Sequence, residues 1–152
     1  MILYIDDLLK EINILNFYRG EAAKRGDVNA DVVQSDKSTQ ETMMFFVRKA
    51  VTDILLLLNS GSAKFTGKVE DDCLKFEVSP VNEGKEYMME ILKEAIRQYL
   101  VMEVRRLWMM TVRPEWADGT LREELMMNMI SAFRCVGKGE RVRRRSTNLA
   151  GI

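Results

Sequence analysis

Residues 83–112 read EGKEYMMEILKEAIRQYLVMEVRRLWMMTV, and this stretch decides the fold. Apolar side chains recur in it every three or four positions, which is the spacing of one helix face. The stripe consists of Tyr87, Met88, Ile91, Leu92, Ala95, Ile96, Tyr99, Leu100, Val104, Leu107 and Trp108. A helix from about Asn82 or Glu83 to Val112 spans roughly 45 Å at 1.5 Å per residue. That is about the width of a domain of this size, so we expect this helix to be central, with Pro114 ending it.

Three shorter helices are predicted around the central one. The first begins near Asp6 and runs to Tyr18 or on through residues 21–24, before a polar loop that reaches Asp36. Its apolar side chains at helical spacing are Leu8, Leu9, Ile12, Leu15 and Phe17.

The other two short helices each follow a capping box. Ser38-Thr-Gln-Glu41 opens a helix that stops at Asn59-Ser60-Gly61, and Thr120-Leu-Arg-Glu123 opens one that closes at Gly137. In this motif the hydroxyl accepts from the glutamate amide while the glutamate side chain reaches back.

Strand-like alternation occurs between the second and third helices. Apolar Ala63, Phe65, Gly67 and Val69 alternate with polar residues, and Leu74, Phe76 and Val78 do the same after the acidic turn at residues 70–72. Two period-2 segments around a turn predict a β-hairpin. The sequence therefore predicts a mainly α protein: a four-helix bundle-like domain over residues 1–137 with one hairpin between its second and third helices, followed by a basic, flexible tail at 138–152.

Composition argues against most catalytic chemistry. Histidine is absent, which removes the commonest general base and metal ligand. Cys73 and Cys135 lie far apart and form no CxxC pair, so there is no local zinc motif. Two lone cysteines suit a reducing compartment and leave one disulfide open. We expect no catalytic, cofactor-binding or metal-binding residue and interpret the chain as a non-enzyme.

Two short motifs fit ordinary structure better than binding. The segment Gly61-Ser-Ala-Lys-Phe-Thr-Gly67-Lys68 has five residues between its glycines, where a phosphate-binding loop has four, and Val69 stands where a Ser or Thr is needed. The acidic trio Glu70, Asp71 and Asp72 lacks the further ligands of a calcium loop. We interpret the first as a hairpin strand and the second as a solvated turn.

Methionine and tryptophan in the second half are candidate contact residues. Met is common at adaptable interfaces, and Trp is favoured at protein contacts. Plain core is the alternative for most of the methionines. Those outside the main stripes, Met109, Met110 and Met126, fit an interface better, and Trp108 and Trp116 join them as candidates.

The strongest charge asymmetry lies at the end of the chain. Residues 138–152 contain one acidic residue, Glu140, and five basic residues: Lys138, Arg141, Arg143, Arg144 and Arg145. Residues 1–137 hold 18 basic and 22 acidic side chains. A tail of this kind can neutralise nucleic-acid phosphates, dock on an acidic protein, or serve only for solubility. No aromatic residues interleave with the arginines, so base stacking has no support.

The segment KEAIRQYLVMEVRRLWMM (residues 93–110), then Arg113-Pro114-Glu115-Trp116, a shorter amphipathic helix and a basic tail, resembles small structural proteins of tailed phages and prophages of Bacteroides-type gut bacteria. These are similar in size to head–tail connector (adaptor) proteins. The resemblance covers roughly residues 85–145 and has no invariant motif. It implies helical subunits that form a ring under the portal, contact other virion proteins, and carry terminal extensions that order on docking.

Two hypotheses for function follow. The first is a non-catalytic phage-type structural or head–tail connector protein, acting by self-association and docking of its tail. The second is a DNA-associated or regulatory helical protein that binds phosphates through Arg141–Arg145. The N-terminus lacks a signal-peptide pattern, and no apolar stretch reaches membrane-span length. We therefore expect a protein of the host cytoplasm or the virion, without a membrane.

Overall fold

The computed structural model describes residues 1–23, 37–59, 63–84 and 86–137. The predicted loop up to Asp36 and the basic tail from Lys138 onward, including Arg141, Arg143, Arg144 and Arg145, lie outside the described residues. Within these ranges, four α-helices and two short 3-10 turns accompany a small three-stranded antiparallel sheet. The prediction of a mainly helical protein is confirmed in this coarser form.

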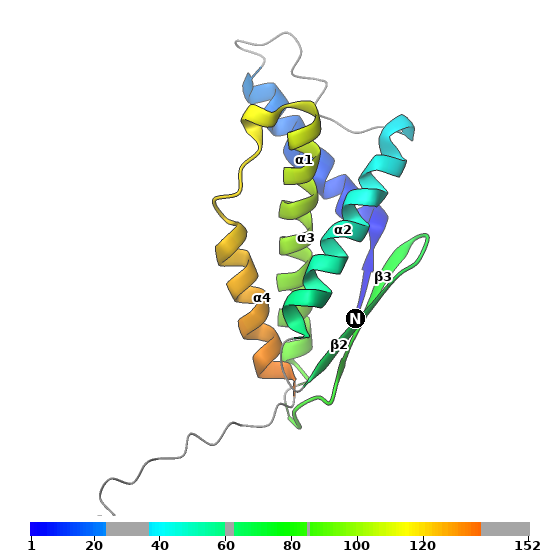
Figure 1. The fold of residues 1–152 in the computed structure, drawn as a ribbon, viewed down its shortest axis with the longest axis vertical. Helices are drawn as coiled ribbons and strands as arrows, with labels where there is room; N and C mark the ends of the chain where they lie inside the picture. Colours follow the sequence, from blue (N-terminus) through cyan, green and yellow to red (C-terminus); the bar gives the residue numbers. More distant parts are fainter. Residues whose placement is uncertain (24–36, 60–62, 85, 138–152) are drawn as a thin grey trace, which may run out of the picture.

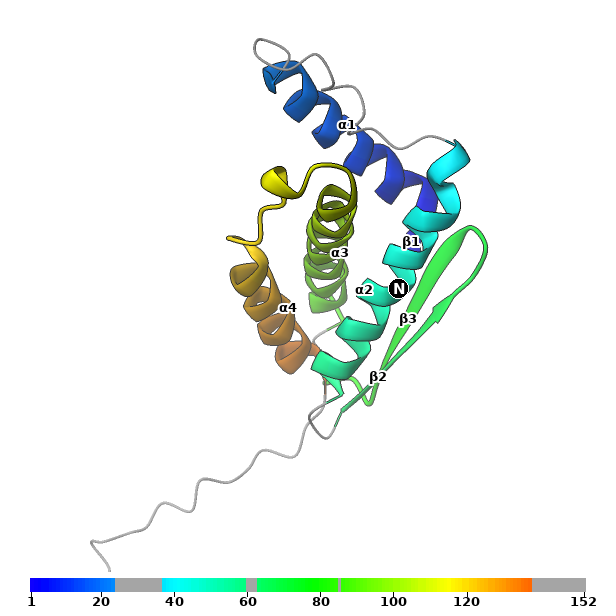
Figure 2. The ribbon, with the colours of Figure 1, turned by 45° about the horizontal axis from the view of Figure 1, so that its top comes forward.

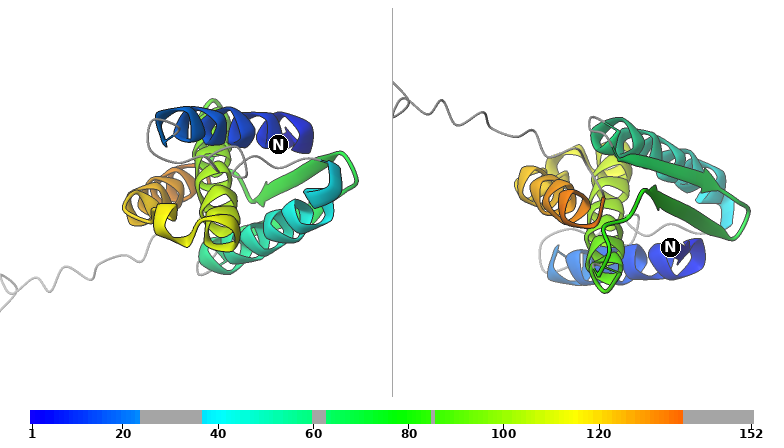
Figure 3. Two further views of the ribbon diagram at one scale, coloured as in Figure 1. Left: turned by 90° about the horizontal axis from the view of Figure 1, so that it is seen from above. Right: turned by 90° about the horizontal axis from the view of Figure 1, so that it is seen from below.

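The central position of the third predicted helix is also confirmed. This helix, α3 (Met88–Val112), packs against α1 (Ile5–Ala23), α2 (Gln40–Leu58) and α4 (Arg122–Val136). Seen from either end of the molecule, α3 lies between the other three helices (Figure 3). Helix α1 runs obliquely across α3 rather than alongside it (Figures 1 and 2). The arrangement therefore differs from a simple bundle of four parallel rods.

The predicted hairpin consists of β2 (Lys64–Val69) and β3 (Cys73–Ser79), with Phe65 opposite Val78 and Gly67 opposite Phe76. A third strand, β1 (Ile2–Tyr4), pairs with the other side of β3 and was not predicted. Three residues are too few to show alternation, so only the pairing reveals the strand. The hairpin is thus part of a sheet rather than an isolated insertion.

Three helix starts differ from the predictions. Helix α2 begins at Gln40 after a 3-10 turn at Lys37–Thr39, so the capping position is Thr39 rather than Ser38, and its side chain makes no capping bond. Helix α4 begins at Arg122 with Leu121 at the capping position, in place of Thr120. Helix α3 begins at Met88, about one and a half turns later than expected. The predicted ends of α2, α3 and α4 are correct.

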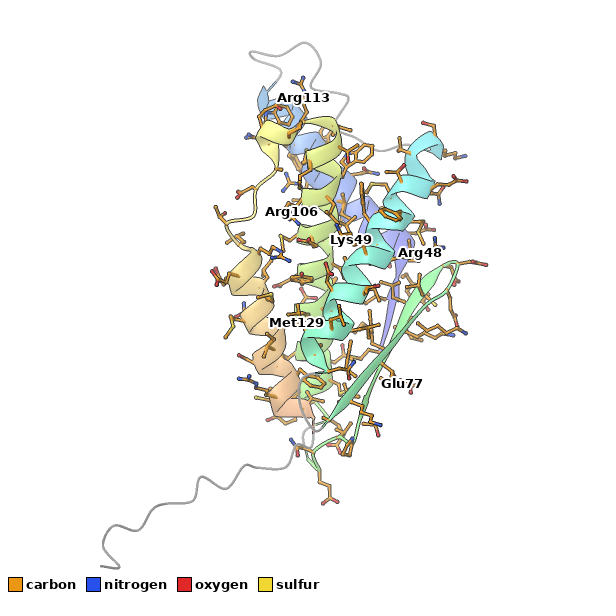
Figure 4. The ribbon with its side chains drawn as sticks, in the orientation of Figure 1. Arg48, Lys49, Glu77, Arg106, Arg113 and Met129 are labelled. Atoms are coloured by element: carbon orange, nitrogen blue, oxygen red, sulfur yellow. The ribbon has the colours of Figure 1, made fainter. Side chains whose placement is uncertain are left out.

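The core lies between the inner face of the sheet and the helices. Phe65 and Phe76 stack with ring centroids 5.3 Å apart, and Phe133 of α4 meets Phe65 edge-on at 5.9 Å. The Asn59 side chain links the end of α2 to β2, because it accepts from the Phe65 amide at 2.8 Å and donates to the Phe65 carbonyl. In Figure 4, Met129 of α4 lies on the side facing α3, and it is fully buried.

Helix α1 buries the first half of the predicted face, Leu8 and Ile12, but not its second half. Its buried positions are Ile5, Leu8, Ile12 and Asn16, spaced three, four and four residues apart. Leu15 and Phe17, which were predicted to lie on the buried face, are both exposed. The apolar character of α1 extends round the helix, so periodicity alone could not select the face that packs.

Candidate functional site

A cleft of about 280 Å³ opens where α1, the second half of α3, the 3-10 turn η3 (Pro114–Trp116) and the start of α4 meet. Its walls are mostly apolar, with a few polar groups among them. They are formed by Glu11, Leu15, Gln98, Val101, Met102, Arg105, Arg106, Met109, Trp116, Asp118, Thr120, Leu121 and Leu125. A concave, largely apolar site with a few polar groups is the usual form of a ligand site.

The most unusual group in the cleft is the half-buried guanidinium of Arg105. Its Nε donates to the Oδ1 of Asn16 at 2.9 Å. No carboxylate of the described residues forms an ion pair with it. Burial lowers the pKa of Arg105, the positive charge of nearby Arg19 lowers it further, and the negative charge of Asp118 raises it by less. The cleft therefore holds a partly desolvated cation whose charge Asp118 offsets only in part and without an ion pair.

Asn16 holds Arg105 in place from the side of α1. It belongs to the buried stripe of that helix, where an apolar residue would be expected. Its Oδ1 accepts from Arg105, while its Nδ2 is buried and has no hydrogen-bond partner among the described residues. Leaving a buried donor unpaired costs about 1–3 kcal/mol, so the position is not optimised for stability alone.

Trp116 forms the wall of the cleft next to these cations. The guanidinium of Arg19 lies 5.0 Å from the centroid of its ring, and that of Arg113 lies 5.2 Å from it. Both distances are within the range of cation–π contacts. Arg113 also pairs with Glu115 at 3.2 Å and sits at the far end of α3 (Figure 4). This end of the molecule thus combines an indole ring with several arginines.

The two acidic residues of the cleft already have partners. Glu11 accepts a hydrogen bond from Arg97, which also pairs with Glu94 at 2.5 Å. Asp118 accepts from the Thr120 amide at 2.9 Å, and this bond holds the pKa of Asp118 below its usual value. Among the described cleft residues, Arg105 is therefore the cation that forms no ion pair, and Asp118 acts on it only through space.

A buried ion cluster lies beside the cleft. Glu103 is only 1% exposed and pairs with Arg106 at 2.6 Å and with Arg122 of α4 at 3.3 Å. Burial raises the pKa of Glu103, but the two arginines outweigh burial and hold the pKa below its usual value. Nearby Tyr99 is fully buried, and its hydroxyl has no hydrogen-bond partner in the described part of the chain. Because Arg106 is ion-paired with Glu103, its charge is not available to a ligand in the cleft.

A second feature is an apolar surface on the outer side of α1, formed by Ile14, Phe17 and Tyr18. These three side chains are 55%, 46% and 66% exposed. They occupy positions i, i+3 and i+4, which lie together on one helix face. The opposite face of α1 carries Ile12 and packs on the core. We call this group the α1 surface.

The predicted contact residues fall in different places. Trp108 and Met109 are 3% and 2% exposed, so they belong to the interior of the chain, and their role as contact residues stays a prediction. Met110 is about half exposed, Met126 is partly buried against the core, and Trp116 lines the cleft. The helix turns by about 100° per residue, which is why Met110 faces outward although its neighbour does not.

The hairpin turn brings Glu70, Asp72 and Cys73 together, with their side-chain donor atoms within 4.8 Å of one another. Lys75 pairs with Glu70 at 2.8 Å and Lys68 does so at 3.3 Å. Burial raises the pKa of the Cys73 thiol, and the neighbouring carboxylates raise it further, so the thiol is kept protonated. Both lysines pair with Glu70, so they offset part of the negative charge of the turn. Both cysteines are free, which answers the question of a single disulfide.

Sequence reasoning missed Arg105 and Asn16. The available signal was a polar residue, Asn16, four positions after Ile12 on the face that packs inward. Because the predicted stripe used Leu15 and Phe17 instead, that signal was not visible.

Comparison of the chain with protein-family models, with curated proteins and with solved structures finds no match in any of the three. None of the helices in the described parts of the chain combines the length and the apolar character needed to cross a membrane. A function for this chain is therefore inferred from its own residues, in particular from the cleft and the α1 surface.

Proposed function

We propose that this chain is a non-catalytic structural protein that works through contacts with other proteins, of the phage type to which head–tail connectors belong. The observation that carries the proposal is the α1 surface. Helix α1 is apolar on its inner face and again on its outer face at Ile14, Phe17 and Tyr18. A helix that is apolar on both sides is typical of a helix covered on both sides. A neighbouring subunit would provide the missing cover.

Two further features support the proposal. The outer side of the sheet exposes Ile2 and Tyr4 on the edge strand β1, which offers unpaired backbone groups to a neighbour. Exposed apolar groups that gather on a surface mark contact sites more often than groups scattered singly. The resemblance of residues 85–145 to small phage structural proteins gives the class of assembly.

Two experiments test this proposal. The first is the order of neighbouring genes: portal and capsid genes alongside support it, and an isolated transcription unit contradicts it. The second is incorporation into particles. The double variant Phe17→Ser/Tyr18→Ser should no longer co-purify with particles made from that gene cluster, while its thermal unfolding midpoint stays within a few degrees of wild type.

The control is Phe45→Ser, which removes an equally exposed aromatic residue from α2. It should co-purify normally. Normal incorporation of the double variant would remove the α1 surface from the proposal, and absence of the wild-type chain from the particles would remove the proposal itself.

The basic tail favours the second function, binding of DNA phosphates, and it is tested separately. DNA binding by the full chain should weaken steeply with salt and disappear in a chain that ends at Gly137. Binding that survives this truncation contradicts a role for Lys138 and Arg141–Arg145.

A further inference from the structure

The cleft beside Arg105 has the chemistry of a binding site, and no contact proposed above uses it. Its apolar walls come from α1, α3 and α4, and its polar lining residues are Glu11, Gln98, Arg105, Arg106, Asp118 and Thr120. Its volume of about 280 Å³ lies just below the usual range for pockets that hold drug-sized ligands. A cleft of this volume suits a smaller organic molecule.

Arg105 has no structural role that uses its charge. It lies about two turns before the end of α3, and α3 has no basic residue in its last turn, so Arg105 does not neutralise that helix end. Its recorded hydrogen bond joins it to a neutral amide, the Oδ1 of Asn16. Its neighbour Arg106, in contrast, is bound to the buried carboxylate of Glu103. Asp118 offsets the charge of Arg105 only through space, so an anion in direct contact with this half-buried cation would stabilise it.

We propose that the cleft binds a small organic monocarboxylate, with its carboxylate on Arg105 and its apolar or aromatic body against Trp116 and Met102. A guanidinium offers two parallel N–H donors that match a carboxylate. The Nε of Arg105 is held by Asn16, so the two terminal nitrogens remain for the ligand. Glu11 and Asp118 line the same cleft, and they repel a singly charged carboxylate less than a phosphate dianion.

The test uses the full chain and 3-phenylpropionate as the probe. Binding should shift the NMR resonance of the Trp116 indole N–H, assigned with Trp116→Phe, and should raise the thermal unfolding midpoint. The amide 3-phenylpropionamide has the same body without the charge, and acetate has the charge without the body. Each should bind at least about tenfold more weakly than 3-phenylpropionate. Inorganic phosphate should not compete.

Arg105→Gln removes the charge at nearly constant length and should weaken 3-phenylpropionate binding by about tenfold or more. The matched control is Arg134→Gln, an exposed position in the last turn of α4, which should bind like wild type. If Arg105→Gln does not fold, Met102→Trp, which fills the cleft without touching the charge, should abolish binding.

Three results would overturn the proposal. They are an unmoved Trp116 resonance at about 10 mM probe, equal affinity for the acid and its amide, and undiminished affinity in Arg105→Gln or Met102→Trp. None of these results bears on the α1 surface, so the two proposals fail independently.

Discussion

The two ends of α3 are packed in opposite ways. At its beginning, the rings of Phe65, Phe76 and Phe133 pack together on the inner side, toward the sheet and the ends of α2 and α4; we call this inner side the closed end. On the outer side, an open surface groove lies between α3 and α4. At its other end, α1, η3 and the start of α4 leave the cleft beside Arg105; we call this the cleft end. Apolar rings pack without loss, whereas guanidinium groups keep part of their hydration. The cleft therefore lies where arginines of α3 face its neighbours, whereas the closed end is packed by rings that β2, β3 and α4 contribute.

The largest expected effect comes from Trp108, which lies in the cleft-end half of α3 but inside the core. Trp108→Ala should lower the free energy of unfolding by about 3–5 kcal/mol, because it deletes a large buried side chain. Urea unfolding followed by circular dichroism measures this. Met110→Ala, at the half-exposed position two residues later, should change the value by less than about 0.5 kcal/mol. If Trp108→Ala and Met110→Ala both changed the free energy of unfolding by a similar small amount, the core would not extend to the cleft end of α3.

The next effect concerns the buried ion cluster next to the cleft. The arginines depress the pKa of Glu103 below its unfolded value, so the ionised form contributes stability at neutral pH that is lost as pH falls through the folded pKa. Glu103→Gln should therefore lower the free energy of unfolding by about 2 kcal/mol at pH 7.

The loss in Glu103→Gln should begin to shrink as the pH falls below the ordinary glutamate pKa of about 4.3. It should vanish once the pH is below the depressed folded-state pKa, where the wild-type carboxyl is protonated as well. Urea unfolding at pH 7 and at acidic pH gives both values. Glu90→Gln, at an exposed position of the same helix, is the control and should leave stability unchanged at both pH values. A loss in Glu103→Gln that is independent of pH would contradict the role of its charge.

The smallest effect is expected when the same substitution, glycine to alanine, is made at the closed end and at the cleft end. A Cβ on Gly137, at the closed end, would lie 2.7 Å from the Cβ of Ala63, so Gly137→Ala should lower the free energy of unfolding by about 1–2 kcal/mol through overpacking. A Cβ on Gly119, beside the cleft, meets only Arg106 Cδ at 3.6 Å. Gly119→Ala should be neutral or stabilise by up to about 1 kcal/mol, because it restricts the unfolded chain. Thermal unfolding of both variants checks the contrast, and similar losses would argue against the difference in packing.

The sequence by itself determined the local elements of this protein. The period of the apolar residues predicted α3, Pro114 predicted its end at Val112, and its length predicted its central place. The alternation from Ala63 to Val78 predicted the hairpin. These patterns are readable because they repeat over short distances along the chain. The division into a domain at 1–137 and a flexible tail, the partners and the cellular location stay predictions.

Tertiary structure alone decided which faces meet. The amino group of Met1 donates to the Phe76 carbonyl at 2.8 Å, which joins β1 to the sheet. The Oδ1 of Asn16 accepts a hydrogen bond from Arg105, which lies 89 positions further along the chain. Trp108 is buried and Phe17 exposed, although both are aromatic residues on apolar helices. Side-chain type fixes how much free energy burial provides, but the long-range packing of helices and strands selects which of several apolar faces is buried.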